Sequence, residues 1–411
     1  MKNQTDPEIK APEITPEEAS EYTLGEEHPP IEEAPTDEEI FDISMDAEPI
    51  DEDIKKHRKK AKRKRNKRKA LIIIFIAFFS LCVLLLAAFL ILEAIGRSQM
   101  LEMEEAKIEI SEQVKEELDI KEKEDGKTIK YKGETYRLNE NMTTILCMGI
   151  DKDDMSAEGY GANGQADANI LLAIDTETGK TSAIAINRDA MINTSVYSDS
   201  GKFLGAEKQQ LCLAFANGDG EEKSAENMMK SVSSLFYGIP VNSYIAIDLE
   251  AIGPLNELVG TVKVTSPETI SSYSGYYFEK GKTYTLDSPE AAEAFVRARD
   301  VTVLDSNVSR MERQKVYLKA FSSAAIKKTK EEITFPVGLY SAITDYNIND
   351  LSIPKIVFLT STIVKGRENV NLKFLNVEGE VKKGEEKAEF YPDDKKLFEL
   401  VLKVFYEKEI D

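Results

Sequence analysis

Two aspartates stand at the ends of apolar runs that are typical of buried strands. Asp151 follows the run 145–150, and Asp167 precedes the run 170–174, with a glycine-containing loop between them. Carboxylates at the ends of neighbouring strands can face one another, and two carboxylates with waters and phosphate oxygens form a usual site for Mg²⁺ or Mn²⁺. A divalent-metal site is one interpretation; from spacing alone, a turn aspartate and a strand-capping aspartate without a ligand are the more common outcome.

Arginines form the second chemical pattern. Arg188 and Asp189 end the apolar run 182–186, where such a pair fits anion binding with local bracing. Four further arginines lie within 17 residues of an otherwise acidic chain: Arg297, Arg299, Arg310 and Arg313. The last two are three residues apart and share a face if their segment is helical. Because the planar guanidinium binds phosphate oxygens bidentately, we interpret the set as a phosphate clamp, with solvated surface ion pairs as the alternative.

The absence of histidine from most of the chain restricts the kinds of catalytic site that the sequence can form. His28 and His57 are the two histidines, so residues 58–411 contain none. This excludes a Ser-His-Asp triad, a Cys-His pair and a His-ligated zinc site from that region. Three cysteines are too few for a disulfide framework, and we expect Cys147 and Cys212 to be buried free thiols. Carboxylates, arginines and a hard metal ion remain as the catalytic inventory.

Charge is distributed unevenly along the 411-residue chain, whose formal net charge is -21. Residues 1–54 hold 19 acidic residues against two lysines, which predicts a disordered acidic tail. Residues 55–70 form a basic juxtamembrane segment, and residues 71–94 form an apolar stretch long enough for a transmembrane helix. The one-sided basic segment places the N-terminus in the cytoplasm and the C-terminal domain outside the plasma membrane. The acidic balance argues against nucleic-acid binding.

Beyond the membrane segment, the pattern predicts a helical stalk over 95–127, a folded domain over 128–385 and a C-terminal helix within 386–411 that packs on this domain. Strands are expected over 143–150, 168–175, 182–187 and 244–248. Helices are expected over 207–217, 224–237, 289–296 and 308–328. Strands that alternate with helices indicate a layered α/β domain.

Several short motifs, in order, resemble those of the LytR-CpsA-Psr family, the cell-wall polymer ligases of mostly Gram-positive bacteria. The first are ILCMGID at 145–151, GQAD at 164–167 and IAINRD at 184–189. Next come LFYGIP at 235–240, YIAID at 244–248 and LVGTV at 258–262, followed by AFVRAR at 294–299 and RMERQ at 310–314. Each motif is weak alone, but the ordered set behind an apolar anchor is specific.

The resemblance implies an α/β/α sandwich with a central mixed sheet and a groove for a polyprenyl lipid. It implies an enzyme that uses Mg²⁺, or Mn²⁺, to transfer a glycopolymer such as teichoic acid from a polyprenyl-pyrophosphate carrier to peptidoglycan. By this resemblance Asp151 and Asp167 hold the metal, and Asp189 orients Arg188. Catalysis is implied for Arg188, Asp189, Arg297 and Arg299, and pyrophosphate binding for Gln165, Arg188, Arg297, Arg299, Arg310 and Arg313. Phosphoryl transfer needs positioning and charge neutralisation more than a strong nucleophile, so it fits a domain without histidine.

Two positions depart from the family pattern. Gln165 stands where the family usually has arginine, and Asn307 stands where it usually has aspartate. The loss of the arginine leaves open a weakened enzyme or a non-catalytic scaffold that binds polyprenyl phosphates. A transcriptional regulator is disfavoured, because the membrane segment separates the folded domain from the cytoplasm.

Overall fold

The structure is a computed structural model that describes residues 50–411, except 102–107, 152–163, 199, 333, 366–371, 386 and 410–411. The predicted acidic tail lies almost wholly outside the described residues. The chain divides into two units, Met1–Cys82 and Val83–Asp411, and each is described by itself.

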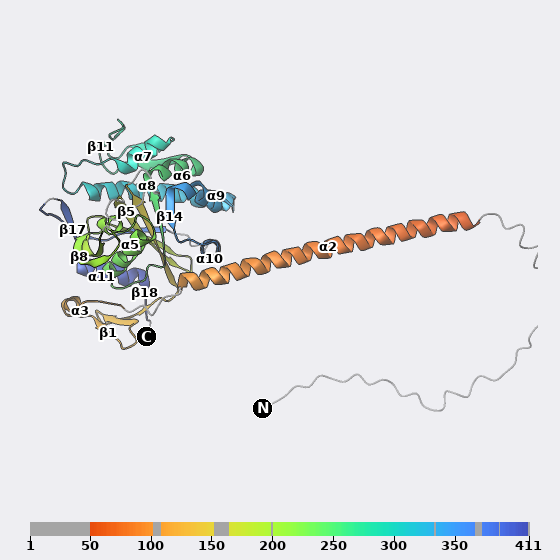
Figure 1. Cartoon of the computed structure of the whole chain (residues 1–411), viewed down its shortest axis with the longest axis horizontal. Coiled ribbons are helices and arrows are strands. Elements are labelled where there is room, and N and C mark those ends of the chain that lie inside the picture. The colour runs from red at the N-terminus through yellow and green to blue at the C-terminus, as the bar shows by residue number, and fades with distance from the viewer. Residues whose placement is uncertain are drawn as a thin grey trace, which may run out of the picture. The chain divides into compact units, whose positions relative to one another are not determined.

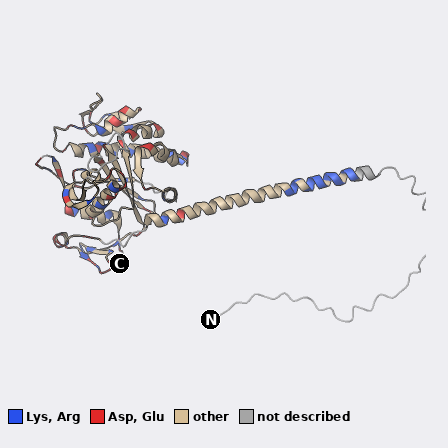
Figure 2. Cartoon of the chain, viewed as in Figure 1, with Lys and Arg blue, Asp and Glu red and all other residues tan. Residues whose placement is uncertain are grey.

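A single helix, α2 (Ile50–Leu101), contains the basic segment and the apolar stretch predicted from the sequence. Within the described residues, it is the helix long and apolar enough to cross a membrane. Lys and Arg gather on the first half of the helix, whereas the following turns are almost free of charge (Figure 2). Apolar side chains of these turns are exposed, among them Leu71, Phe75 and Leu84. These features suggest a single-pass membrane protein.

The Val83–Asp411 unit is built on a six-stranded sheet in the order β14-β9-β4-β5-β6-β15. Its strands are β4 (Met142–Ile150), β5 (Ala166–Asp175), β6 (Thr181–Ile186), β9 (Ser243–Asp248), β14 (Asn347–Asn349) and β15 (Leu372–Asn376). β5 is antiparallel to both β4 and β6, whereas β4 pairs with β9, and β6 with β15, in parallel. The expected mixed sheet is therefore confirmed.

Helices cover both faces of this sheet (Figure 1). One side carries α5 (Glu222–Leu235) and α11 (Asp394–Phe405), and the other carries α6 (Ile252–Val259), α7 (Pro289–Arg297) and α8 (Ser306–Glu331). Successive side chains of a strand point to opposite faces of the sheet, so alternate residues contact the helices on opposite sides. Leu146, Met148 and Ile150 of β4 belong to the main core, which also contains residues of α5 and α11. The α/β/α sandwich is confirmed.

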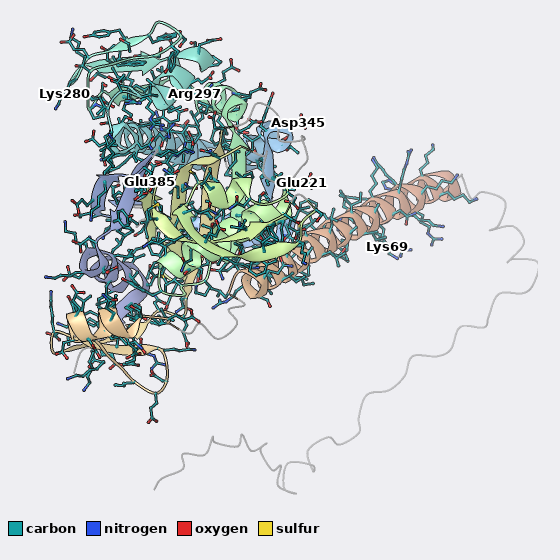
Figure 3. All side chains as sticks on the ribbon, turned by 60° about the vertical axis from the view of Figure 1, so that its left-hand side comes forward. Lys69, Glu221, Lys280, Arg297, Asp345 and Glu385 are labelled. Carbon is teal, nitrogen blue, oxygen red and sulfur yellow. The ribbon has the colours of Figure 1, made fainter. Side chains whose placement is uncertain are left out.

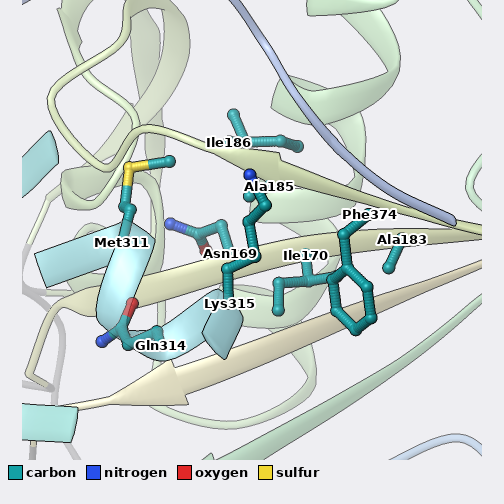
Figure 4. A pocket seen from close by; sticks show the side chains of 9 residues that line it. All are labelled: Asn169, Ile170, Ala183, Ala185, Ile186, Met311, Gln314, Lys315 and Phe374. Carbon is teal, nitrogen blue, oxygen red and sulfur yellow. The ribbon is translucent and has the colours of Figure 1, made fainter. Parts of the chain in front are cut away.

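The face under α8 is closely packed near the β5–β6–β15 side. A cavity of about 20 Å³ lies between these strands and α8, lined by residues such as Ile170, Ala185, Met311 and Phe374 (Figure 4). A cavity of this size has room for about one water molecule. α8 is therefore packed on the sheet at this point, and the large opening described below lies elsewhere.

The remaining elements surround the sandwich. A second sheet combines β1 (Lys121–Glu122), β2 (Thr128–Tyr131), β3 (Glu134–Leu138) and β18 (Tyr406–Lys408). Two-stranded sheets are formed by β7 (Met191–Tyr197) with β8 (Phe203–Gln210), β10 (Val262–Thr265) with β13 (Thr283–Leu286), β11 (Ile270–Ser271) with β12 (Tyr277–Phe278), and β16 (Gly379–Lys383) with β17 (Ala388–Pro392). Short helices are α3 (Glu112–Leu118), α4 (Leu213–Ala216), η1 (Leu249–Ala251), α9 (Phe335–Ala342), η2 (Thr344–Tyr346) and α10 (Ile353–Lys365).

Two sequence predictions are wrong in the described residues. Instead of a helical stalk over 95–127, α2 ends at Leu101, and α3 and β1 follow with Ile110, Val114 and Ile120 in the main core. This segment packs on the domain because its apolar side chains find partners there. The predicted helix 207–217 is mostly strand β8, which pairs with β7, followed by the short helix α4. The C-terminal helix is present as α11, between β17 and β18.

Candidate functional site

The antiparallel register brings the predicted site residues to one edge of the central sheet. Gly149 of β4 pairs with Ala168 of β5, and Asn169 of β5 pairs with Ile186 of β6. The end of β4, the start of β5 and the end of β6 therefore meet at the same edge. Asp151, Asp167 and Arg188 occupy these three positions, as their places beside apolar runs predict.

Asp167 is the centre of an ion-pair cluster. Its Oδ1 accepts a hydrogen bond from Nη1 of Arg188, and its Oδ2 accepts one of 2.8 Å from Nη1 of Arg310. The second terminal nitrogen of Arg188 donates to Oε1 of Gln165 and lies 3.1 Å from Sγ of Cys212. The structure thus joins two of the predicted arginines, from β6 and α8, through one carboxylate.

Asp189 lies behind Arg188 and is 4% exposed. Nδ2 of Asn307 donates to its Oδ2, and Nε2 of Gln210 donates to its Oδ1 at 2.9 Å. The same Oδ1 is 3.5 Å from Nε of Arg188, a buried nitrogen without a hydrogen-bond partner. A carboxylate held by two amides cannot move freely, so Asp189 is a fixed negative charge beside Arg188.

Helix α7 positions the next two arginines. Ser288 caps the helix by accepting a hydrogen bond from the backbone N–H of Ala291, and Pro289 opens its first turn, as the sequence predicted. Arg297 ends the helix and is half-exposed, with Nη1 2.5 Å from Oε1 of Glu293 and Nη2 3.7 Å from Oδ1 of Asp151. Both contacts leave much of its guanidinium accessible.

Arg299 follows α7, and its Nε donates a hydrogen bond of 3.0 Å to Oγ of Ser306 at the start of α8. Burial lowers the pKa of Arg310 to about 10, and the charge of Arg188 adds to this effect. Burial likewise lowers the pKa of Arg299, with the charge of Arg310 as the next cause. Burial deprives these arginines of water, and their positive charges repel one another. A bound anion would offset both unfavourable contributions to the free energy of the site.

Arg313 does not join this cluster, although it shares α8 with Arg310. It is 1% exposed, and its guanidinium pairs with the carboxylate of Glu268 and donates to the carbonyl of Phe295 at 3.1 Å. Burial lowers its pKa. The sequence could not reveal this role, because Glu268 is 45 residues away in the chain. Arg313 braces α8 against α7 and the β10–β11 connection.

An apolar groove of about 710 Å³ ends at the cluster. Its floor is the face of the sheet opposite the main core, with Cys147, Ile170 and Ile247 from three strands. Residues of α6, α7 and α8 line its wall, such as Leu255, Ala294 and Phe321. At one end stand Asp151, Asp167, Arg297, Arg299 and Arg310. Arg297 is labelled in Figure 3, on the part of the domain that carries α7.

The thiols belong to this region without forming a disulfide. Cys147 and Cys212 are free, as expected. Burial raises the pKa of the Cys147 thiol to about 12, so this thiol is an apolar part of the groove floor. Burial also raises the pKa of Cys212, while the charge of Arg188 opposes the shift. Neither thiol has the lowered pKa of a nucleophile.

The structure also identifies site residues that the sequence did not mark. Gln210 and Cys212 lie within the mispredicted segment 207–217, and their contacts to Asp189 and Arg188 depend on the β7–β8 hairpin. Asn307 was marked only as a departure, yet its amide links Asp189 to Arg310, whose Nη2 donates to Oδ1 of Asn307 at 3.1 Å. No local pattern identifies such partners, which come from distant segments.

The carboxylates present suit a hard divalent cation. Among the described residues, no three His, Cys, Asp or Glu side chains gather to hold a metal by themselves. Asp151 and Asp167 both line the cluster end of the groove. The two oxygens of Asp167 accept hydrogen bonds from arginines, but each carboxylate oxygen has a further lone pair. Two oxygen ligands, completed by water and phosphate, fit Mg²⁺.

A mixed-sheet α/β/α domain whose apolar groove ends at an arginine–aspartate cluster agrees with the family expected from the motifs. A model of the LytR_cpsA_psr family matches residues 101–403. Because this match covers well over half of the chain, the chain belongs to the LytR_cpsA_psr family.

Relatives of the chain are named as transferases. It is 27% identical over 242 residues to the polyisoprenyl-teichoic acid–peptidoglycan teichoic acid transferase TagU of Oceanobacillus iheyensis. The aligned region covers 58% of this chain and 68% of that protein. The chain is 29% identical over 209 residues to the corresponding TagT of Bacillus subtilis, covering 49% and 56% of the two chains. The matches to these two relatives span 68% and 56% of their lengths.

A solved structure supports the fold. The protein gbs0355 from Streptococcus agalactiae superposes with a TM-score of 0.51 at 20% identity, over 64% of this chain and 86% of that one. At this identity the likeness concerns the arrangement of strands and helices alone.

Proposed function

We propose that this protein transfers a glycopolymer from a polyprenyl-pyrophosphate carrier to peptidoglycan outside the plasma membrane. The observation that carries the proposal is the apolar groove of about 710 Å³ that ends at a cluster of arginines and aspartates. A polyprenyl pyrophosphate has a long apolar chain joined to a compact polyanion, which matches a groove of this kind. The teichoic acid–peptidoglycan transferase names of relatives such as TagU support the same reaction.

In this proposal the prenyl chain lies in the groove over Cys147, Ile170 and Ile247, and the pyrophosphate contacts the arginines at its end. Arg310 and Arg188 now share Asp167, so they are already oriented toward the anion before it binds. Arg299 and Arg297 close the site from the end of α7. Guanidiniums are suited to this role because their paired donors match phosphate oxygens.

The reaction is a phosphoryl transfer. A hydroxyl oxygen of the acceptor glycan forms a bond to the sugar-bearing phosphorus, the bond from this phosphorus to the bridging oxygen breaks, and polyprenyl phosphate leaves. The hydroxyl proton passes to solvent. Arg188, Arg299 and Arg310 neutralise charge on the phosphoryl oxygens, while buried Asp189 holds Arg188 in place. Mg²⁺ held by Asp151 and Asp167 would add charge neutralisation at the pyrophosphate.

The membrane topology completes the proposal. The carrier lipid lies in the bilayer, so an enzyme anchored by α2 meets it in the plane of the membrane. The twelve Lys and Arg between residues 55 and 69 favour the cytoplasmic side for the N-terminus. The folded domain that follows the transmembrane segment is then outside the cell, where peptidoglycan is assembled.

The test uses the full-length protein in lipid nanodiscs with a polyprenyl-pyrophosphate-linked saccharide, soluble peptidoglycan strands and Mg²⁺. We expect release of polyprenyl phosphate together with saccharide bound to the strands. Arg188→Ala and Asp167→Ala should each reduce the rate at least about 100-fold, in the range of a lost transition-state contact. Arg137→Ala, at an exposed position of β3, is the control and should keep full activity. Equal rates in all four proteins would contradict the proposal.

A second function follows from Gln165, which stands where the family pattern has arginine. A non-catalytic protein would bind the carrier in the groove and scaffold wall assembly. The same nanodisc experiment separates the two functions, because a scaffold binds the donor tightly and releases no polyprenyl phosphate with any acceptor.

A further inference from the structure

A second pocket, of about 390 Å³, opens beside the arginine cluster; about half of its lining is polar, whereas the lining of the groove is mostly apolar. Its wall is formed by Gln165, Arg188 and Asp189 at the sheet edge, by Arg299 and Asn307 near the α7–α8 connection, and by the turn of the β16–β17 hairpin. Arg299 and Val301 line both this pocket and the groove, so the two openings meet at the cluster. Arg188 faces the polar pocket, whereas Arg310 faces the groove.

The hairpin brings two lysines, Lys383 and Lys387, to this pocket. Both are exposed, and Lys387 is close enough for its charge to lower the pKa of Cys212 at the cluster. Among the described residues that line the pocket, the charged ones are four cations and one carboxylate, that of Asp189, whose oxygens are bound by Asn307 and Gln210. The accessible charge of the pocket is positive in a chain whose net charge is -21.

Two hydrogen bonds to backbone groups of the hairpin hold it beside the edge of the sheet that carries Asp189. Phe390 N–H donates to the carbonyl of Asp189 at 2.8 Å, and Gln210 Nε2 donates to the carbonyl of Ala388 at 2.7 Å. Gln210 simultaneously binds the carboxylate of Asp189. Glu385, labelled in Figure 3, lies in the turn that joins the two strands. The lysines are thus presented at a defined place beside Asp189 and Arg188.

The geometry of the proposed transfer indicates which substrate binds in the second pocket. In a phosphoryl transfer, the attacking oxygen and the leaving oxygen lie roughly in line on opposite sides of phosphorus. If polyprenyl phosphate leaves toward the apolar groove, the attacking hydroxyl approaches from the other side of the cluster, where the polar pocket opens. Peptidoglycan strands carry peptide stems with carboxylates, which lysines can bind.

We propose that the pocket between the β16–β17 hairpin and the α7–α8 connection binds the acceptor strand, with Lys383 and Lys387 contacting the carboxylates of its peptide stems. This inference rests on the transfer reaction proposed above. It assigns the groove to the donor and the polar pocket to the acceptor.

The test compares wild type with Lys383→Ala/Lys387→Ala in full-length protein in nanodiscs, with the donor saccharide and soluble peptidoglycan strands. Because each lysine is exposed, the double variant should fold, and its lost ion pairs should raise KM for the strands roughly fivefold to twentyfold. KM for the donor and kcat should stay within about twofold. Lys382→Ala is the matched control, because Lys382 lies over the ring of Tyr391, 5.1 Å from its centroid, and outside the pocket.

A second arm removes the peptide stems from the strands with an amidase. Wild type and the double variant should then have similar KM values, since the carboxylates are gone. An unchanged KM for intact strands, or a rise in KM for the donor instead, would overturn the inference.

Equilibrium binding of fluorescent strands to the same nanodiscs separates this inference from the proposed function. Binding weakened by the double substitution, in a protein that shows no transfer, would retain the acceptor pocket and reject the transferase. Transfer and binding that are both insensitive to the lysines would retain the transferase and reject the pocket.

Discussion

At the scale of single residues, Gln165 and Asn307 are parts of one hydrogen-bonded chain. Gln165 accepts from Arg188, and Arg188 and Arg310 both donate to Asp167. Asn307 accepts from Arg310 and donates to Asp189. Relative to the family pattern, one position lacks a positive charge and the other lacks a negative charge. The two departures therefore leave the net charge of the cluster unchanged, which favours a retained site over a damaged one.

This balance predicts coupling between the two positions. Asn307→Asp should place a second carboxylate against buried Asp189 and destabilise the fold by about 2–4 kcal/mol. Gln165→Arg alone should add a further cation next to Arg188 and cost stability less, because this position is half-buried. The double variant should recover at least half of the loss in melting temperature. Thermal unfolding of the four proteins, beside donor turnover, measures the coupling; strictly additive effects would contradict it.

The sequence predicted this site well where local patterns determine it. Asp151 and Asp167 were expected to face one another because apolar runs mark the strands beside them, and the register brings both to one edge, together with Arg188 at the end of the next strand. Arg313 was grouped with Arg310 because both lie on one helix, but its partner Glu268 belongs to a distant segment. Hydrogen-bond partners that come from distant segments leave no periodic signal, so the roles of Gln210 and Asn307 required the structure.

At the scale of elements, buried strands and capped helices were predicted closely. The expected strand 244–248 and helix 289–296 correspond to β9 and α7. The segment 207–217 failed because β8 is mostly exposed and polar, so it lacks the alternation that identifies a strand. Its conformation is determined by pairing with β7. Tertiary pairing outweighed local preference there.

Helix α7 provides a stability prediction. Ser288→Ala removes the oxygen that accepts from the N–H of Ala291 at 3.2 Å and should cost about 1 kcal/mol. In a domain of this size the melting temperature should fall by about 2–4 °C. Ser288→Asp, which keeps an acceptor at the cap, is the control and should melt like wild type. If both variants melt at the wild-type temperature, the cap contributes nothing to α7.

The groove provides a second prediction for the elements. Ile247 of β9 lies on its floor, half-buried, so Ile247→Trp should fill volume that the prenyl chain would use. We expect weaker binding of long-chain polyprenyl pyrophosphate, by roughly tenfold, and little change for inorganic pyrophosphate. Ile247→Val, which keeps the shape, should bind both as wild type does. Titration calorimetry with the two ligands checks the result, and equal loss for both would place the effect outside the groove.

At the scale of the whole molecule, the last turns of α2 are part of the folded domain. Met100 is fully buried in a small core with Ile145, Ile174 and Phe358, and its carbonyl accepts a hydrogen bond from Thr143. The expected independent stalk is therefore absent from the described part of this segment. A stalk was predicted because a charged sequence with helical spacing does not show which of its apolar side chains pack against the domain.

The contact between α2 and α10 predicts how this connection can be loosened. A Cβ at Gly96 would lie 1.9 Å from the carbonyl oxygen of Pro354, so Gly96→Ala must push the two helices apart. Nearby hydrogen bonds join Glu93 to Ser361 at 2.7 Å and Gln99 to Ser352 at 2.8 Å, and these should weaken. We expect a melting temperature lower by about 4 °C or more, at the larger end of single-residue effects for this size.

The same substitution should affect activity only with a donor that lies in the membrane. With a donor embedded in nanodiscs, Gly96→Ala should slow transfer, because it loosens the contact of α10 with the end of α2 next to the membrane segment. With a short-chain donor dissolved in detergent, its rate should match wild type. Gly338→Ala in α9 is the control, since a Cβ there meets no atom within 4 Å and alanine favours helix. Equal slowing with both donors would contradict this prediction and mean that Gly96 supports the fold of the site itself.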